Sequence, residues 1–178
     1  MSPYLFDHLT LKEVIEDLAA KLEKAGFNGK IQIVGGAAMT LSIYPTREAT
    51  LDVDAKWKQS EIFNEVVEQI TKERNFPSGW LNDDFAKFLP PVHDGDWVEV
   101  HRSGTVTIEA ATPEFLLAMK LFADRGARDR GDTVVLIKIL GITTPKEAEA
   151  ILERYWPGEG LSKATHAFLQ EFFAPDRE

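Results

Sequence analysis

The sequence contains no cysteine, which excludes disulfide bonds and thiolate metal sites. It also lacks any run of about 20 apolar residues, the length that a membrane-spanning helix needs. Its first residues, MSPYLFDHLTLKEVIED, carry acids where a signal peptide needs a basic and then an apolar run. We therefore expect a cytoplasmic protein that does not enter the membrane.

Basic residues are outnumbered, because 20 lysines and arginines stand against 29 aspartates and glutamates and give a formal net charge of −9. Proteins that coat nucleic acid non-specifically work by neutralising phosphates, so this charge argues against that class. The net charge does not exclude a local basic patch that binds one nucleic-acid end. With 178 residues, 44% of them apolar, the chain is long enough for one globular domain with a buried core.

The first part of the chain alternates helical and strand patterns. Its first helix is amphipathic, with Thr10 and Glu13 forming a capping-box pattern and Gly26 providing the stop. Ser60 is the expected N-cap of a later helix. The expected elements are a helix over 10–25, a strand over 30–34, a short helix over 36–43, a strand over 49–55, a helix from 60, a loop over 76–96 with a helical turn near Phe85 and Phe88, and a hairpin of strands 97–101 and 105–109.

The remainder of the chain is helical. Thr112 and Thr144 are each followed by proline, a pattern typical of a helix start, and further helices are expected before Gly141 and over 162–173. We expect an α+β protein. Residues 1–111 would form the core, a small mixed β-sheet flanked by helices, and residues 112–178 a C-terminal helical bundle packed on it as a single compact unit.

Two short motifs carry the chemistry. Gly35 and Gly36 follow a strand and precede a helix, where backbone N–H groups can approach a phosphate. Asp52 and Asp54 lie in the second expected strand, on one face and about 7 Å apart, so a cation should lie between them. Alone, the glycine pair is also typical of a tight turn, and the acid pair is also typical of a solvated strand face. Together they indicate a metal–nucleotide site, because Mg²⁺ is commonly held by carboxylates plus substrate phosphates.

In this order the residues resemble the nucleotidyltransferase superfamily with the polymerase-beta-like fold. The matching segments are IVGGAAMTL and ATLDVDA, an apolar strand with two glycines and then a strand with an acid pair. More specifically, the chain looks like the abortive-infection (AbiEii-like) type of bacterial nucleotidyltransferase toxins. The further matching residues are Arg47 and Thr50 before the acid pair, Lys120 on the helix EFLLAMKLFA, and Asp129 and Asp132 in an Arg-Asp-x-x-Asp segment.

The resemblance implies transfer of a nucleotide from an NTP to an acceptor hydroxyl, with loss of pyrophosphate. Asp52 and Asp54 would hold Mg²⁺ or Mn²⁺. A third acid on a neighbouring strand is common in the superfamily; Glu99 and Glu109 both fit, and Glu109 is favoured because its strand ends near the Lys120 helix. The nucleotide would be bound by Gly35, Gly36, Arg47 and Thr50.

Lys120 would supply a point charge to the triphosphate, with Asp129 and Asp132 orienting it or acting as a base. The alternative is structural. A lysine at the edge of an apolar helix often extends its ammonium to solvent, and acids near a helix N-terminus complement the helix dipole.

The sequence leaves three possibilities for the acceptor and the function. The toxin-like resemblance implies the 3′ end of tRNA and a cognate antitoxin protein as partner, and Lys56, Lys58 and Arg47 could grip RNA phosphates. A second class modifies a cationic antibiotic, with which the acidic charge is compatible. In a third, the chain is a non-catalytic binding partner with the same fold. The RNA reading is favoured.

Overall fold

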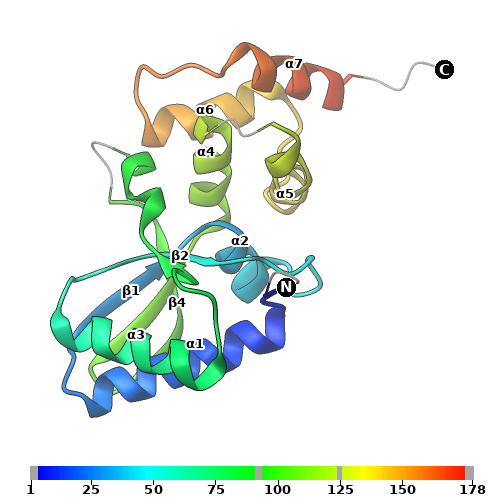
Figure 1. The fold of residues 1–178 in the computed structure, drawn as a ribbon. Coiled ribbons are helices and arrows are strands. Elements are labelled where there is room, and N and C mark those ends of the chain that lie inside the picture. The colour runs from blue at the N-terminus through cyan, green and yellow to red at the C-terminus, as the bar shows by residue number, and fades with distance from the viewer. Residues whose placement is uncertain (1–3, 91–93, 124–125, 175–178) are drawn as a thin grey trace. The chain divides into compact units, whose positions relative to one another are not determined.

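The computed structural model describes residues 4–90, 94–123 and 126–174, which fall into two compact units (Figure 1). The first unit comprises Met1–Lys87 and Trp97–Ala111, and the second comprises Phe88–Asp96 and Thr112–Glu178. Within the described residues, no helix has the length and apolar character needed to cross a membrane.

A mixed sheet of five strands forms the centre of the first unit, in the order β3-β2-β1-β5-β4. The central strand β1 runs antiparallel to β2 and parallel to β5. At the edges, β4 is antiparallel to β5 and β3 is parallel to β2. The small mixed sheet of the expected α+β fold is thereby confirmed. The strands are β1 (Gly29–Ile33), β2 (Val53–Trp57), β3 (Leu81–Asn82), β4 (Trp97–Ser103) and β5 (Val106–Ala111).

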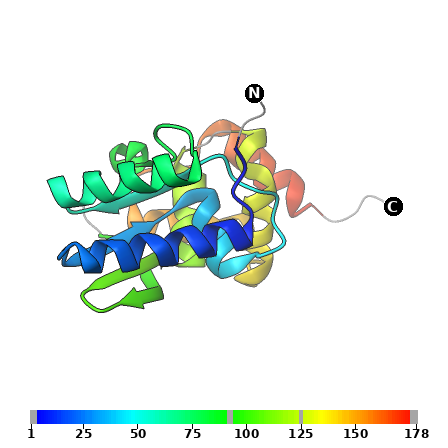
Figure 2. The same ribbon diagram turned by 60° about the horizontal axis from the view of Figure 1, so that its bottom comes forward.

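One face of this sheet is apolar and carries the helices α1 (His8–Lys24) and α3 (Glu61–Arg74), which lie side by side (Figure 2). Successive strand residues point to opposite faces, so Val53 and Ala55 of β2 are fully buried while Asp54 between them is only half-buried. Phe63 of α3 packs against this face. The opposite face of the sheet therefore carries the polar side chains.

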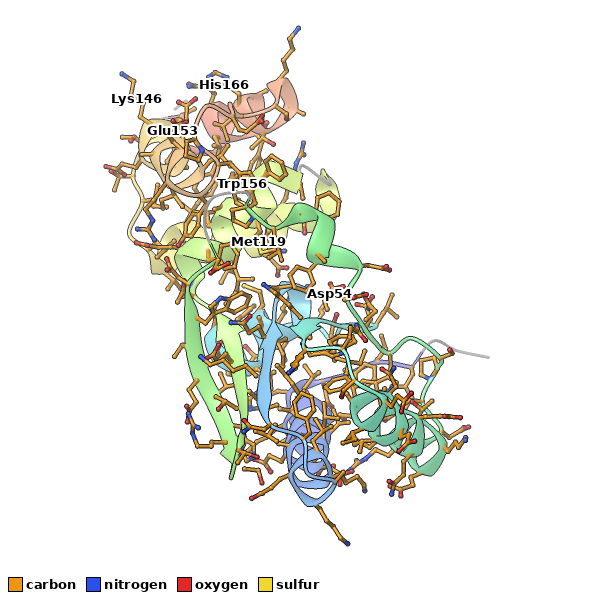
Figure 3. The ribbon with its side chains drawn as sticks, turned by 90° about the vertical axis from the view of Figure 1, so that its left-hand side faces the viewer. Asp54, Met119, Lys146, Glu153, Trp156 and His166 are labelled. Atoms are coloured by element: carbon orange, nitrogen blue, oxygen red, sulfur yellow. The ribbon has the colours of Figure 1, made fainter. Side chains whose placement is uncertain are left out.

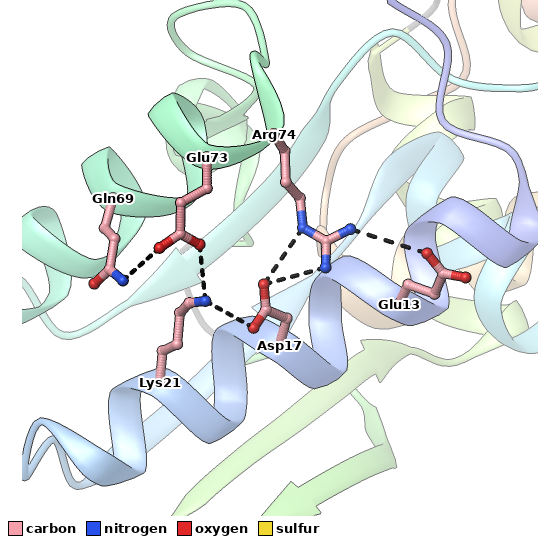
Figure 4. Close-up of polar contacts among 6 residues, drawn as sticks. All are labelled: Glu13, Asp17, Lys21, Gln69, Glu73 and Arg74. Atoms are coloured by element: carbon pink, nitrogen blue, oxygen red, sulfur yellow. Dashed lines mark hydrogen bonds and ion pairs between the residues drawn. The ribbon is translucent and has the colours of Figure 1, made fainter.

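Ion pairs join α1 to α3 along their exposed edges (Figure 4). Lys21 Nζ lies 3.0 Å from an Asp17 oxygen and 2.9 Å from a Glu73 oxygen. Arg74 Nη2 lies 3.2 Å from the other Asp17 oxygen. Exposed pairs contribute little singly, but a shared network restrains both helices on the same face of the sheet.

The first helix begins earlier than its sequence pattern predicts. The expected capping box of Thr10 and Glu13 is wrong, because the Asp7 side chain accepts the hydrogen bond of the Thr10 N–H at 2.8 Å and caps α1. The stop is as expected, since Gly26 follows the helix with a φ of 84°. Ser60 caps α3 as predicted, accepting from the Phe63 N–H at 3.1 Å.

The second strand also differs from its prediction, since β2 covers 53–57 rather than 49–55. Thr50 instead forms an isolated bridge with Phe6, in which both backbone N–H groups donate to the other's carbonyl, at 2.7 and 3.0 Å. Asp52 therefore lies just before the strand and Asp54 within it. The expected short helix after Gly35 is present as α2 (Gly35–Ala38) and the π-helical turn η1 (Met39–Ile43).

Residues 76–96 contain β3 and the predicted helical turn, η2 (Asp84–Phe88). The second unit is helical, as expected. Thr144 caps α6 as expected, and in addition forms a capping box with Glu147. The Tyr155 hydroxyl donates to the Asp96 carboxylate, which fastens residues 94–96 to the helices. Its helices are α4 (Pro113–Ala123), α5 (Ala127–Ile139), α6 (Pro145–Tyr155) and α7 (Lys163–Phe172).

Candidate active site

The glycine pair and the second aspartate meet in the first unit. A Cβ placed on Gly35 would lie 3.0 Å from Asp54 Oδ2. A Cβ on Gly36 would lie 2.9 Å from Thr50 Oγ1 and 3.2 Å from Arg47 Nη1. The structure thus brings together Gly35, Gly36, Arg47, Thr50 and Asp54, which we call the glycine–acid cluster.

The strand ladder explains why these segments meet. The Val34 N–H donates to the Asp54 carbonyl at 2.9 Å, which continues the antiparallel pairing of β1 and β2 by one step. Gly35 then turns the chain away with a φ of 62°, a conformation that residues with a side chain rarely adopt. Glycine at this position allows both the turn and the close approach of the Asp54 carboxylate.

Thr50 and Arg47 are held over Gly36 by backbone contacts. The bridge to the fully buried Phe6 fixes the backbone of Thr50. Arg47 Nη1 donates to the Glu48 carbonyl at 2.8 Å, and the Arg47 N–H donates to the Tyr44 carbonyl at 3.0 Å. A hydroxyl and a guanidinium therefore flank the second glycine.

The acid pair has the chemistry of a site for a hard cation. Asp54 lies on β2 (Figure 3), on the opposite sheet face from the buried Val53 and Ala55, and both it and Asp52 are half-buried. Among the residues that the structure describes, no group of three or more His, Asp or Glu side chains could hold a metal by itself. Two carboxylates nevertheless fit Mg²⁺, which usually keeps several waters and binds substrate phosphates.

Glu109 lies apart from the acid pair. Its carboxylate accepts from Lys30 Nζ at 2.6 Å and from Gln32 Nε2 at 2.9 Å. In the sheet register Glu109 faces Gln32, which faces Lys56 on β2, so two strand spacings of about 5 Å each separate it from β2. The structure does not bring Glu109 beside Asp54.

Glu99, the other candidate for a third acid, forms an ion pair with Arg102. Arg102 Nε donates to its carboxylate at 3.1 Å, and this hydrogen bond holds the pKa of Glu99 below its ordinary value. Lys30 and Gln32 were not among the residues predicted for the site, although both bind Glu109. The alternation in KIQIV was the available signal, because it places both side chains on the polar face.

Lys120, Asp129 and Asp132 meet inside the second unit. Lys120 Nζ lies 2.9 Å from Asp129 Oδ1 and 2.8 Å from Asp132 Oδ2, and each of the three residues is less than 10% exposed. Thr133 Oγ1 donates to the Asp129 carbonyl at 2.8 Å. The ammonium is thus buried between two carboxylates and does not extend to solvent. The side chain of Arg128 lies outside the described residues.

No known protein-family model matches the chain, and no curated protein sequence matches it. Among solved structures, the chain is similar to an antigenic nucleotidyltransferase-like protein from Paracoccidioides brasiliensis. The TM-score is 0.51 at 18% sequence identity, and the match covers 85% of this chain and 90% of that chain. The chain therefore has a nucleotidyltransferase-like fold.

Proposed function

We propose that the chain is a nucleotidyltransferase of the abortive-infection (AbiEii-like) type, which uses Mg²⁺ or Mn²⁺ to transfer a nucleoside monophosphate from an NTP to an acceptor hydroxyl. The observation that carries this proposal is the glycine–acid cluster. The Asp54 carboxylate lies against the bare backbone of Gly35, and the Thr50 hydroxyl and the Arg47 guanidinium lie against that of Gly36. These are the groups that a metal-bound triphosphate requires.

Each member of the cluster, together with the neighbouring Asp52, has a role in the proposed reaction. Asp52 and Asp54 hold the cation, which when bound neutralises phosphate charge and makes the acceptor hydroxyl a better nucleophile. The missing side chains of Gly35 and Gly36 let phosphate oxygens reach backbone N–H groups. The Arg47 guanidinium and the Thr50 hydroxyl donate hydrogen bonds to the same oxygens.

The transfer is a single displacement at the α-phosphorus. The acceptor oxygen forms a bond to this phosphorus, the bond to the α–β bridging oxygen breaks, and pyrophosphate leaves with that electron pair. The proton of the acceptor hydroxyl passes to solvent. Positioning and charge neutralisation supply most of the rate acceleration in such a reaction.

The acceptor that we propose is the 3′ end of tRNA. Lys56 lies two residues beyond Asp54 on the same sheet face, Lys58 directly follows β2, and both are exposed. Two exposed cations that follow the acid pair along the chain suit phosphates of a single-stranded RNA end. Extending that end would stop translation, which is the action of a toxin controlled by an antitoxin protein.

The proposal is tested by incubating the protein with each labelled NTP, Mg²⁺ and total tRNA. We expect label on tRNA with wild-type protein and none with Asp54→Asn. Glu65→Gln, an exposed acid on α3, is the matched control and should retain full transfer. Label that appears on no RNA, or label that is equal with Asp54→Asn, would contradict the proposal.

A further inference from the structure

The polar face of the sheet carries two lysines in line with the second aspartate. On β2, Asp54 and Lys56 point to this face, because they are two residues apart. Gln32 of β1 stands directly opposite Lys56 in the antiparallel ladder, and Lys30 lies two residues away from Gln32 on the same face. We call Lys56, Gln32 and Lys30 the lysine path.

The charge of the lysine path is opposite to that of the whole chain. Lys56 and Lys30 are both exposed, and 62% of the Lys30 side chain is accessible to solvent. The chain as a whole carries a formal net charge of −9. A polyanion is therefore repelled by most of the protein and attracted to places where exposed cations gather.

Lys30 is restrained in its position on the path. Its Nζ donates to the Glu109 carboxylate at 2.6 Å, and Gln32 Nε2 donates to the other oxygen of the same carboxylate at 2.9 Å. An ammonium has three N–H donors, so this bond leaves two of them for a ligand. A side chain that is already held in place loses less entropy when it binds a ligand than a freely moving one.

The spacing of the path suits an extended strand of nucleic acid. Along β2, Lys56 lies about 7 Å from Asp54. Lys30 is the diagonal neighbour of Lys56 across the ladder, at about 7–8 Å. Proteins that bind single strands commonly follow the backbone with such a series of cations. A strand that ends at the acid pair therefore meets Lys56 first and Lys30 next.

We propose that the acceptor RNA lies along the lysine path, with its 3′ hydroxyl at the acid pair, one phosphate at Lys56 and a further phosphate at Lys30. This inference rests on the proposed RNA acceptor and adds Lys30 to the residues that bind it. It concerns the binding of the RNA and not the transfer step, so the two are tested separately.

The test is the binding of a short single-stranded RNA with a free 3′ end, measured by fluorescence anisotropy over a range of salt concentrations at a fixed Mg²⁺ concentration and without NTP. We expect Lys30→Gln to bind several-fold more weakly than the wild type. The slope of log K against log salt should become shallower by about 0.7, the value for one phosphate contact on a single strand. Lys30→Arg, which keeps the charge, should retain the slope of the wild type.

Lys24→Gln is the matched control. Lys24 is an exposed lysine in the last turn of α1, which lies on the other face of the sheet, and its loss changes the net charge by the same amount. This variant should retain the slope of the wild type. Equal slopes for Lys30→Gln and Lys24→Gln would overturn the inference and leave the proposed transfer to RNA intact. Wild-type protein that binds no RNA would overturn both.

A second measurement uses the wild-type chain alone and does not depend on the stability of a variant. In ¹⁵N-labelled protein, the backbone amide signals of Lys30 and Gln32 should move in a saturable way as the same RNA is added. The Lys24 signal should stay in place. RNA that binds without moving the signals of Lys30 and Gln32 would contradict the lysine path.

Discussion

Gly35 lies directly against Asp54, so that a Cβ on the glycine would stand 3.0 Å from the carboxylate oxygen Oδ2. The contact follows from the Val34–Asp54 hydrogen bond, which aligns the end of β1 with the start of β2. It joins the two motifs that the sequence separates. A phosphate that approaches the glycine backbone therefore also approaches a carboxylate that can share its cation.

Gly36→Ala should damage the site. The added methyl would meet Thr50 Oγ1 at 2.9 Å and Arg47 Nη1 at 3.2 Å, so both side chains must move. We expect a loss of about 1 kcal/mol in the free energy of unfolding, the low end of the range for overpacking because the position is half-buried, together with weaker NTP binding. Urea denaturation and a nucleotide titration measure the two effects.

Gly131→Ala is the matched control and should act in the opposite direction. Gly131 lies inside α5, and a Cβ there would meet nothing within 4 Å. Alanine in a helix interior should raise the free energy of unfolding by about 0.5–1 kcal/mol. If Gly36→Ala proved as harmless as Gly131→Ala, the close packing of the glycine–acid cluster would be refuted.

Local sequence signals predicted much of this fold. The glycine stops, the Ser60 cap and the helix start at Thr144 are short-range features, and each is found where it was expected. The start of β2 was misplaced because Thr50 pairs with Phe6, a contact between distant segments that propensity cannot reveal. The cap of α1 was misplaced because Asp7 and Thr10 both suit a cap, and tertiary context decided between them.

In the candidate site, too, features set by local sequence were predicted and features set by long-range contacts were not. Gly35, Gly36, Arg47 and Thr50 were identified by their order along the chain, and the fold places them together with Asp54. Glu109 was the favoured third acid by sequence, ahead of Glu99. The register of β5 against β1, which only the folded sheet defines, gives it Lys30 and Gln32 as partners.

Lys120→Ala should be strongly destabilising. It would leave the carboxylates of Asp129 and Asp132 buried without the ammonium that lies 2.9 and 2.8 Å from them. Removing one partner of a buried ion pair typically costs about 3–5 kcal/mol. The control is Lys138→Ala, an exposed lysine in the last turn of α5, which should cost less than about 1 kcal/mol. Equal unfolding midpoints of the two variants would contradict this account of Lys120.

Tyr155 should make the second unit sensitive to alkaline pH. Burial, reinforced by the hydrogen bond to Asp96, raises the pKa of Tyr155 from 10.0 to about 12. The unfolded chain therefore loses this proton first, and its contribution to stability is complete below pH 10 and is lost as pH rises towards about 12. Urea denaturation across this window, compared with Tyr155→Phe, should show the advantage of the wild type shrinking. An advantage that stays constant would contradict the raised pKa.

The most direct test of the central claim is a calorimetric titration of Mg²⁺, with and without an NTP, into wild-type protein and the Asp52→Asn, Asp54→Asn double variant. The variant should remain folded in a thermal melt, because it removes two like charges from one site. We predict Mg²⁺ binding that strengthens with NTP in the wild type and is lost in the double variant. Unchanged Mg²⁺ and NTP binding in the folded double variant would show that the acid pair is not the metal–nucleotide site.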